Sequence, residues 1–259
     1  MFWDPILRYV DVWALHGREG SQYLKYSVGL MALICRTVES MANFEAVLFD
    51  WRGTLVVNLS TREWIERSLD LFGRGMSVDA MDELEGKIEV AENLGELDAP
   101  GVDCDARRHR NEYMKFFIGA GLDQEMAEAF YRVESSAEFN PFADDAFETM
   151  NEIKSRGIQI AIVSDIHFDV RPAFVAAHVD KFIDYYVLSF EHAVQKPDPA
   201  IFAIALEMLD RRPSEVLMVG DRSVNDGAAV ESGIVTLLLP SLVFVGDRRL
   251  HLVRELLGI

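Results

Sequence analysis

The sequence predicts an α/β protein with a Rossmann-like, doubly wound parallel sheet and an inserted domain of helices. Two observations lead to this prediction. From Glu45 onward, short apolar runs alternate with stretches of helical pattern, which is the order expected when parallel strands are joined by helices. Residues 50–157, between the first two apolar runs, show almost no strand pattern and are far more than one crossover connection needs. We therefore expect an insertion after the first strand.

The apolar runs define the expected strands, and the stretches between them define the expected helices of the core. Gly157 and Gly233 each follow a predicted helix, where the left-handed conformation that ends many helices costs glycine little. The strands are predicted at 46–49, 158–163, 185–188, 216–219 and 234–239, and the helices at about 143–156, 171–179, 200–210, 224–232 and 248–257.

The insertion is predicted to be a small bundle of helices at about 61–72, 78–93, 103–119 and 123–136. Its first helix has a clear start, because Ser60 and Glu63 have the spacing of a capping box, in which each side chain bonds the other residue's free backbone amide. We divide the chain into a core domain of residues 44–58 and 141–259 and an α-helical cap domain of residues 59–140. Residues 1–43 form an N-terminal extension, predicted to be helical from Tyr26 to Met41.

Charge and cysteine content restrict the classes of partner and location. The chain has 25 Lys and Arg against 43 Asp and Glu, a formal charge of −18 that repels polyanions, so no nucleic-acid partner is expected. Cys35 and Cys104 are far apart and lack metal-binding spacing, which favours a reducing, cytoplasmic location. The apolar stretch from Val28 to Cys35 is shorter than the ~20 residues that cross a bilayer, so no membrane association is expected. The oligomeric state stays open.

Polar residues that can carry chemistry follow four of the predicted strands. Asp50 ends the first strand and opens an Asp-Trp-Arg-Gly-Thr turn, Ser164 follows the second, and Lys196 opens a Lys-Pro-Asp-Pro segment after the third. Asp221 and Asp226 follow the fourth. Because ligands bind outside the carboxyl ends of parallel strands, we expect these side chains to meet in one crevice. Taken singly, each residue has a structural alternative as a strand end, a solvated loop charge or a helix cap.

Together and in this order, the four segments resemble the four motifs of the haloacid dehalogenase superfamily, over about residues 45–240. The resemblance implies hydrolysis of a small phosphate ester by a covalent route. Asp50 would attack phosphorus and form an aspartyl-phosphate, Ser164 would hydrogen-bond the phosphoryl group, and Lys196 would neutralise negative charge. The implied partner is a small phosphorylated metabolite.

The resemblance also implies a Mg²⁺ site formed by Asp50, the backbone carbonyl of Arg52 and Asp221, with Asp226 either a further ligand or the partner of Lys196. Elementary electrostatics agrees with a cation here, because a carboxylate that faces a phosphate dianion is repelled unless positive charge intervenes. Mg²⁺ prefers oxygen ligands, which this set of residues supplies.

Position 52 departs from the pattern of the family's phosphatases, in which the residue two after the nucleophile is a second aspartate that protonates the leaving group and later activates water. A guanidinium with a pKa above about 12 does not exchange protons usefully near neutrality, and such acid/base catalysis is worth about 10²–10⁴ in rate. The family's dehalogenases have tyrosine here and need no metal, and its phosphonatases have alanine, so Arg52 matches neither.

Three functions remain open. The first is a Mg²⁺-dependent phosphohydrolase whose leaving group needs little protonation, or in which Asp165 or His167 replaces the missing acid. The second is a phosphate-binding or regulatory protein in which Arg52 clamps the phosphate. The third is a metal-free hydrolase of carbon–halogen bonds. The pair of carboxylates at Asp221 and Asp226 favours a metal, and so favours the first function over the third.

Residues beside these motifs are candidate substrate contacts, namely Trp51, Arg52, Asp165 and His167. Trp51 is also expected to pack at the junction of the two domains. The basic run 107–110 in the insertion is interpreted as a solvated helix face, with contact to an anionic substrate as the alternative.

Overall fold

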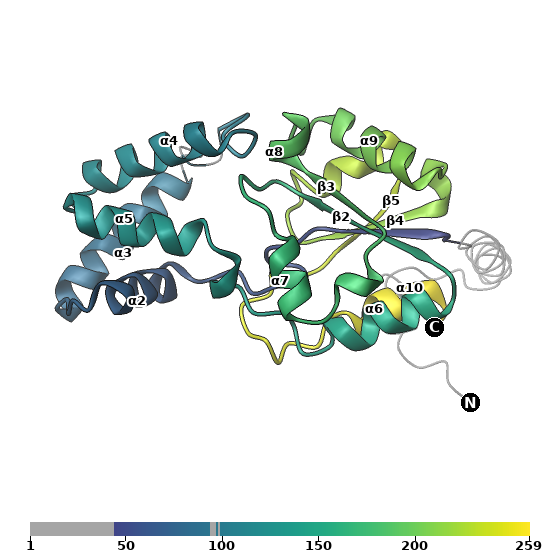
Figure 1. The fold of residues 1–259 in the computed structure, drawn as a ribbon, viewed down its shortest axis with the longest axis horizontal. Helices are drawn as coiled ribbons and strands as arrows, with labels where there is room; N and C mark the ends of the chain where they lie inside the picture. Colours follow the sequence, from purple (N-terminus) through teal and green to yellow (C-terminus); the bar gives the residue numbers. More distant parts are fainter. Residues whose placement is uncertain (1–43, 94–96, 98) are drawn as a thin grey trace, which may run out of the picture. The chain divides into compact units, whose positions relative to one another are not determined.

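A five-stranded parallel sheet lies at the centre of the described chain (Figure 1). The structure is a computed structural model that describes residues 44–93, 97 and 99–259, so the extension predicted at residues 1–43 lies outside it. The strand order β3-β2-β1-β4-β5 places the first strand between the second and the fourth, which confirms the doubly wound α/β class. The strands are β1 (Ala46–Phe49), β2 (Gln159–Ser164), β3 (Tyr185–Leu188), β4 (Val216–Gly220) and β5 (Val235–Leu238).

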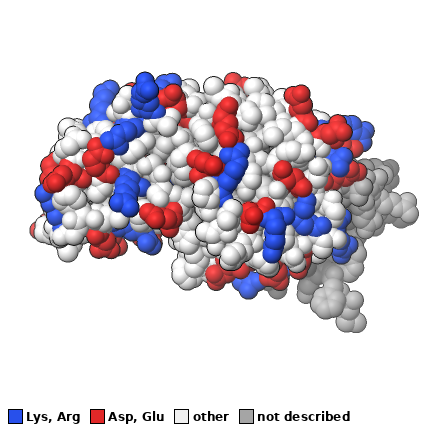
Figure 2. All heavy atoms as spheres, in the orientation of Figure 1, with Lys and Arg blue, Asp and Glu red and all other residues white. Residues whose placement is uncertain are grey.

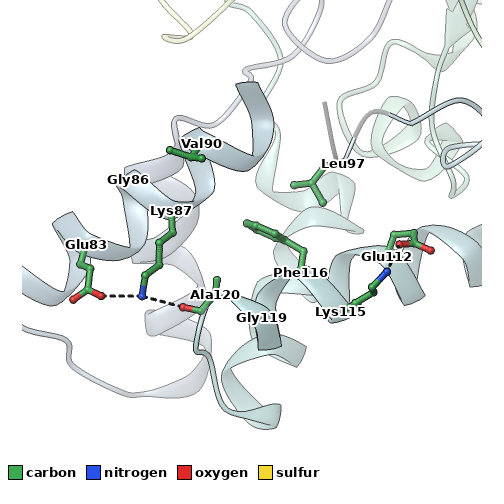
Figure 3. Close-up of a pocket in the computed structure, with 10 residues that line it drawn as sticks. All are labelled: Glu83, Gly86, Lys87, Val90, Leu97, Glu112, Lys115, Phe116, Gly119 and Ala120. Atoms are coloured by element: carbon green, nitrogen blue, oxygen red, sulfur yellow. Dashed lines mark hydrogen bonds and ion pairs between the residues drawn. The ribbon is translucent and has the colours of Figure 1, made fainter. Parts of the chain in front are cut away.

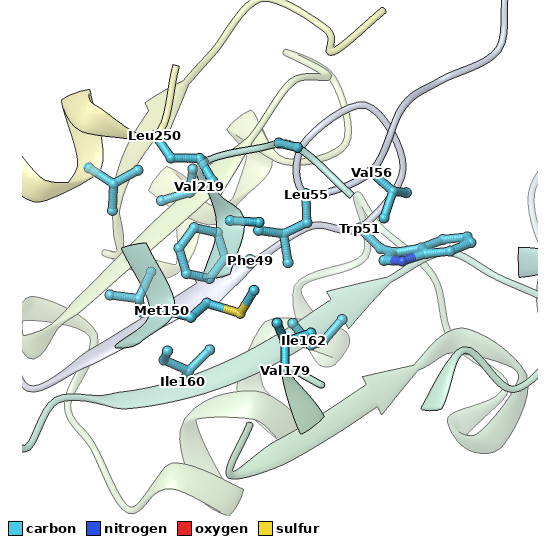
Figure 4. Packing of buried hydrophobic residues seen from close by; sticks show 14 of the residues in the cluster. Phe49, Trp51, Leu55, Val56, Met150, Ile160, Ile162, Val179, Val219 and Leu250 are labelled. Carbon is cyan, nitrogen blue, oxygen red and sulfur yellow. The ribbon is translucent and has the colours of Figure 1, made fainter. Parts of the chain in front are cut away.

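Helices cover both faces of this sheet, because successive residues of a strand point to opposite faces. Ala46 and Leu48 of β1 pack in a cluster with α9 (Pro199–Leu209), whereas Val47 and Phe49 pack in a second cluster with α6 and α10. Figure 4 shows Phe49 in that second cluster beside Met150 of α6. The remaining helices of this part are α6 (Ala146–Ser155), α7 (Arg171–Ala176), α8 (Ser189–His192) and α10 (His251–Leu257).

One predicted core helix is wrong in type and length. The segment predicted as a helix at 224–232 is a short 3-10 helix at Gly227–Ser232, which ends at Gly233 with a φ of 79°. Its start is delayed because the Asp226 carboxylate accepts hydrogen bonds from the amides of Asp221 and Arg222, so residues 221–226 form a turn that this side chain closes. Further 3-10 turns lie at Ala137–Phe139, Asp180–Phe182 and Pro213–Glu215.

The insertion after β1 is helical, as predicted, and we call residues 59–140 the helical insertion. Its first helix begins with the predicted capping box, in which the Glu63 amide donates to Ser60 Oγ and the Ser60 amide donates to the Glu63 carboxylate. The helices enclose an apolar cluster of their own around Trp64, Phe117 and Phe130. They are α2 (Thr61–Phe72), α3 (Val78–Asn93), α4 (Ala106–Gly119) and α5 (Gln124–Glu134).

Residues Phe44–Ile259 together form one compact unit, so the division into core and cap domains stays a prediction. Acidic and basic side chains are interspersed over the face drawn in Figure 2. Within the described residues, each helix is too short or too polar to cross a bilayer.

Candidate active site

The turn after β1 holds Asp50 in place at the carboxyl edge of the sheet. The amides of Leu55 and Val56 donate to the Trp51 carbonyl, and Thr54 Oγ1 donates to Asp50 Oδ2 at 3.1 Å. Gly53 has a φ of 81°, and a Cβ built there would lie 2.3 Å from Asp221 Oδ2. Glycine is therefore required both by the backbone conformation and by the close approach of a second carboxylate.

Lys196 joins two of the carboxylates that follow different strands. Its Nζ donates to Asp50 Oδ1 at 2.7 Å and to Asp226 Oδ1 at 2.5 Å, and the lysine is only 2% exposed. The other oxygen of Asp226 accepts the amides of Asp221 and Arg222 at 3.0 and 2.9 Å. Of the two roles left open for Asp226, the structure shows the partnership with Lys196. Both of its oxygens are occupied, so it anchors the ammonium group and the turn together.

Burial and like charge perturb these groups strongly. Burial raises the pKa of the Asp50 carboxyl; Lys196 opposes this rise, and Asp226 and Asp221 add to it. Burial alone would lower the pKa of Lys196, but the Asp50 and Asp226 carboxylates outweigh it and the net shift is upward. Burial also raises the pKa of Asp221. The Lys196 ammonium group is thus firmly charged. A further positive charge beside the carboxylates would stabilise their ionised form.

The carboxylates fit a hard divalent cation. Asp50, Asp221 and Asp226 each place an oxygen within 4.8 Å of the others. Asp221 Oδ1 is buried and has no hydrogen-bond partner among the described residues, an arrangement that is costly unless a water or ion completes it. Oxygen ligands in a partly solvated cleft are what Mg²⁺ prefers.

Ser164 and Asp165 lie at the end of β2 with different surroundings. Ser164 is 2% exposed and faces the cavity beside Asp50. Asp165 Oδ1 accepts the Lys196 amide at 2.8 Å, and its Oδ2 accepts from Asn225 Nδ2 at 3.1 Å. Burial raises the pKa of Asp165, while Lys196 and these hydrogen bonds lower it. Asp165 therefore positions the Lys196 loop, and each of its oxygens already accepts a hydrogen bond from the protein.

A cavity of about 450 Å³ opens above this cluster, between the sheet edge and the helical insertion. The insertion contributes Trp64, Tyr113 and Glu134 to its wall. The predicted site residues that line it are Asp50, Arg52, Ser164, Asp165, Lys196 and Asp221. The structure thus brings six of the predicted residues to one cavity, with Asp226 directly beneath Lys196.

Two predicted substrate contacts, Trp51 and His167, do not line this cavity. Trp51 is fully buried and packs edge-on against Phe168 with ring centroids 6.0 Å apart, in the apolar cluster of the core. His167 is 3% exposed and stacks on His109 of α4 at 3.4 Å. Both side chains are used for packing. The prediction that Trp51 and His167 contact substrate is therefore corrected.

Arg52 points to the helical insertion and is held there. Its Nη1 donates to Glu134 Oε1 at 2.6 Å, and its Nη2 donates to the Glu134 backbone carbonyl at 2.9 Å. Burial would lower the pKa of the guanidinium, but Glu134 outweighs this and raises it. Arg52 thus carries a permanent charge that is already paired.

A larger cavity, of about 910 Å³, lies within the helical insertion and contains none of the predicted site residues (Figure 3). Its wall is formed by α3 and α4, with Lys87 paired to Glu83 at 2.8 Å and bonded to the Ala120 carbonyl at 3.3 Å. Size alone is a poor guide here, because the groups capable of chemistry gather in the smaller cavity.

Several residues of the site escaped prediction. Thr54 and Asn225 belong to predicted motifs and were detectable as polar residues next to catalytic candidates. Glu134 lies on a helix whose position against the sheet depends on tertiary packing. His109 is only 1% exposed, so the basic run 107–110 is a solvated helix face at Arg107 and Arg108 but not at this histidine.

The fold and the cluster define an α/β protein with a carboxylate and lysine centre at the ends of its strands. The sequence profile of the haloacid dehalogenase-like hydrolases matches residues 44–233. This chain therefore belongs to the haloacid dehalogenase-like hydrolases.

Individual relatives include both phosphatases and dehalogenases. The chain is 24% identical to a glyceraldehyde 3-phosphate phosphatase of Pyrococcus furiosus over 189 residues, covering 72% of this chain and 76% of that protein. It is 31% identical to (S)-2-haloacid dehalogenase 4A of Burkholderia cepacia over 93 residues, only 36% of this chain and 40% of that protein. Among solved structures, the magnesium-bound HAD-hydrolase YfnB of Bacillus subtilis superposes with a TM-score of 0.62 at 14% identity, covering 83% and 99% of the two chains.

Proposed function

We propose that the protein is a Mg²⁺-dependent phosphohydrolase that acts on a small phosphorylated metabolite through an aspartyl-phosphate at Asp50. The observation that supports this proposal best is the buried cluster of Asp50, Lys196 and Asp226 with Asp221 beside it, at the floor of a cavity closed by the helical insertion. In this proposal the insertion is a cap that selects substrate and excludes water.

Asp50, Asp221 and the backbone carbonyl of Arg52 would hold Mg²⁺, with Asp226 fixing the turn that presents Asp221. Bound there, the ion would neutralise phosphate charge and so permit approach of a carboxylate nucleophile. The unpartnered Asp221 oxygen is the feature that supports a cation over a metal-free dehalogenase.

Different residues of the protein orient the nucleophile and bind the phosphoryl group in the first step. Lys196 and Thr54 hold the two oxygens of Asp50, so the nucleophile has one orientation. Ser164 would donate to a phosphoryl oxygen. As the Asp50 oxygen bonds to phosphorus, the bond from phosphorus to the leaving oxygen breaks, and the leaving group takes the electron pair.

The residues weighed from the sequence as the acid for this step are each bound to other groups or lie outside the cavity. Arg52 is permanently charged and bound to Glu134, Asp165 is bound on both oxygens, and His167 is outside the cavity. We therefore infer that the substrate has a leaving group that departs as a stable anion, such as an acyl or activated aryl phosphate. The pairing of Arg52 with Glu134 also speaks against a protein whose Arg52 clamps phosphate.

The dependence of rate on leaving-group acidity tests this inference. With a series of substituted aryl phosphates and Mg²⁺, kcat/KM of the native protein should fall steeply as the leaving group becomes more basic. In Arg52→Asp the added acid should raise kcat/KM for the poorest leaving groups by about 10²–10⁴ and flatten the dependence. Arg52→Ala is the matched control, because it breaks the contact with Glu134 without adding an acid. A shallow dependence in the native protein would contradict the proposal.

The nucleophile is tested by Asp50→Asn, which keeps the shape of the side chain. Turnover of the best aryl phosphate should fall by about 10⁴-fold or more, the scale seen when a covalent nucleophile is removed. Rapid quenching should trap an acid-stable phosphoryl group on the native protein, because no carboxylate at position 52 activates water for its hydrolysis. Turnover that survives in Asp50→Asn would exclude this residue as nucleophile.

A further inference from the structure

A second cluster of potential metal ligands lies where the helical insertion meets the loop after β2. Asp103 and His109 come from the insertion, and His167 comes from the loop. Asp103 Oδ1 is 3.6 Å from His109 Nε2 and 4.0 Å from His167 Nδ1, and the ligand atoms of the three residues lie within 4.8 Å of one another. This cluster shares no residue with the carboxylates around Asp50, although Asp103 also lines the cavity above them.

Both histidine rings are buried, and each has at least one nitrogen without a hydrogen-bond partner among the described residues. His109 is 1% exposed and His167 is 3% exposed. His109 Nδ1 and both ring nitrogens of His167 have no hydrogen-bond partner among the described residues. Leaving a buried polar atom unpaired costs about 1–3 kcal/mol, so the unpaired His167 Nδ1 near Asp103 favours a ligand that uses its lone pair.

Hydrogen bonds to core side chains hold the segments that carry Asp103 and His167. The Ser189 hydroxyl lies 2.8 Å from the Asp103 carbonyl and 3.0 Å from the Ile166 carbonyl, so one core side chain contacts both ligand-bearing loops. The Gly101 amide donates to Gln195 Oε1 at 2.7 Å, which fixes the loop of Asp103 a second time. The site is thus built on rigid contacts.

We propose that Asp103, His109 and His167 bind a divalent transition-metal ion of the zinc type, which ties the helical insertion to the core. Two imidazoles and one carboxylate are a ligand set typical of Zn²⁺ and of its first-row neighbours, whereas Mg²⁺ requires oxygen ligands. Burial lowers the pKa of His109 to about 2 and that of His167 to about 3, so both rings are neutral and offer lone pairs at neutral pH.

The spacing of the ligand atoms is close to what such an ion needs. Ligands about 2.0–2.1 Å from a tetrahedral Zn²⁺ lie about 3.3 Å from each other, so the observed 3.6 and 4.0 Å require only a small contraction. The rings stack with an angle of 15° between their planes, and each lone pair lies in its ring plane. One ring therefore turns about its Cβ–Cγ bond when the ion binds, a torsion with a broad energy well.

The local charge is compatible with an added cation. Arg52 is close enough to lower the pKa of both histidines, but its charge is balanced by Glu134 at 2.6 Å. Asp103 offers a negative charge to the ion itself.

Binding of Zn²⁺ to the full chain tests the site. The protein is stripped with chelator and titrated with Zn²⁺ against a chromophoric competitor, in millimolar Mg²⁺ to fill the carboxylate cluster. We expect one Zn²⁺ per chain, with affinity reduced by more than about 100-fold in His109→Gln and in His167→Gln, since loss of a direct ligand should exceed the loss of an outer-shell partner. His251→Gln, an exposed histidine, is the matched control and should bind as the native protein does. Equal affinity in all four proteins would overturn the proposal.

Two further measurements keep the test independent of how the variants fold. X-ray absorption of the Zn²⁺-loaded native protein should show nitrogen and oxygen ligands with imidazole scattering. Asp221→Asn, which removes a carboxylate of the other cluster, should bind Zn²⁺ unchanged even where it abolishes turnover. Absence of imidazole scattering, or loss of Zn²⁺ in Asp221→Asn, would assign the ion to the carboxylate cluster and overturn the proposal, whether or not the protein is a phosphohydrolase.

Discussion

The two sides of the active-site cavity hold their charged groups in different ways. On the sheet side, the side chains of Lys196, Asp50 and Asp226 are 2%, 9% and 0% exposed, and all three follow strands of one sheet. Where the helical insertion meets the turn after β1, the paired side chains of Arg52 and Glu134 are 25% and 14% exposed. The groups proposed to carry the chemistry are therefore held by the sheet, while the contact between Arg52 and Glu134 is reached by water.

This difference sets the energy that each ion pair contributes. Buried charges must be paired, because an unpaired buried charge is far more costly than an unpaired surface charge. A pair that stays in contact with water gains less from pairing and loses less when it is broken. Breaking the sheet-side cluster should thus cost much more stability than breaking the contact between Arg52 and Glu134.

Replacing Lys196 by methionine should have the largest effect on stability. Lys196→Met leaves Asp50 and Asp226 facing each other without their cation, and we expect the free energy of unfolding to fall by about 3–5 kcal/mol in chelator. Urea unfolding followed by circular dichroism measures this loss.

A double variant separates charge from packing in that result. Adding Asp226→Asn to Lys196→Met removes one of the uncompensated carboxylates, so it should recover part of the lost stability. The double variant could instead be less stable than Lys196→Met by the full cost of a second buried substitution. That result would mean that Lys196 acts mainly by filling space. It would contradict the difference in stability expected between the sheet-side cluster and the contact of Arg52 with Glu134.

The same contrast explains which parts could be predicted from sequence. Asp50, Ser164 and Lys196 were detectable because strand ends converge at one edge of a parallel sheet, so position along the chain determines position in space. The strand bounds at Ala46–Phe49 and Tyr185–Leu188 and the helices of the insertion at Thr61–Phe72 and Val78–Asn93 also agree with the predicted periodicity.

The rest depended on packing that periodicity does not encode. Glu134 and His109 reach the core only because their helices lie against it at a particular angle. The segment after β4 forms a 3-10 helix where an α-helix was predicted, because the Asp226 side chain closes the preceding turn. Arg52 departs from the family pattern in the sequence itself, but its partner Glu134 lies 82 residues away in the chain and has no local signal.

Acid should destabilise the chelated protein through the buried histidines. An unfolded histidine binds a proton below a pH of about 6.5, whereas burial keeps His109 and His167 neutral until about pH 2 and 3. Unfolding therefore takes up protons in this range, so stability is retained above about pH 6.5 and falls as the pH drops toward 3, by up to about 1.4 kcal/mol per histidine per pH unit.

Comparison with His167→Gln isolates this effect from the titration of carboxylates. Urea unfolding between pH 7.5 and 5.5 in chelator should show a shallower loss of stability in His167→Gln, by up to about 1.4 kcal/mol per pH unit, because one of the two histidines buried in the described part of the chain is removed. His251→Gln should follow the native protein. Identical slopes for the native protein and His167→Gln would mean that His167 does not stay neutral in the folded state.

The contact between Arg52 and Glu134 should give the smallest effect and decides whether the two sides of the cavity truly differ. A double-mutant cycle with Arg52→Ala and Glu134→Gln should yield a coupling of only about 1 kcal/mol, since water reaches both side chains. Glu134→Gln keeps the shape of the side chain and leaves the backbone carbonyl as acceptor, so mainly the charge is removed. At 1 M salt, where charges are screened beyond about 3 Å, the coupling should shrink further. A coupling near the cost of Lys196→Met, and insensitive to salt, would show that the insertion is anchored as firmly as the sheet-side cluster, and that the cavity is bounded by rigid contacts on both sides.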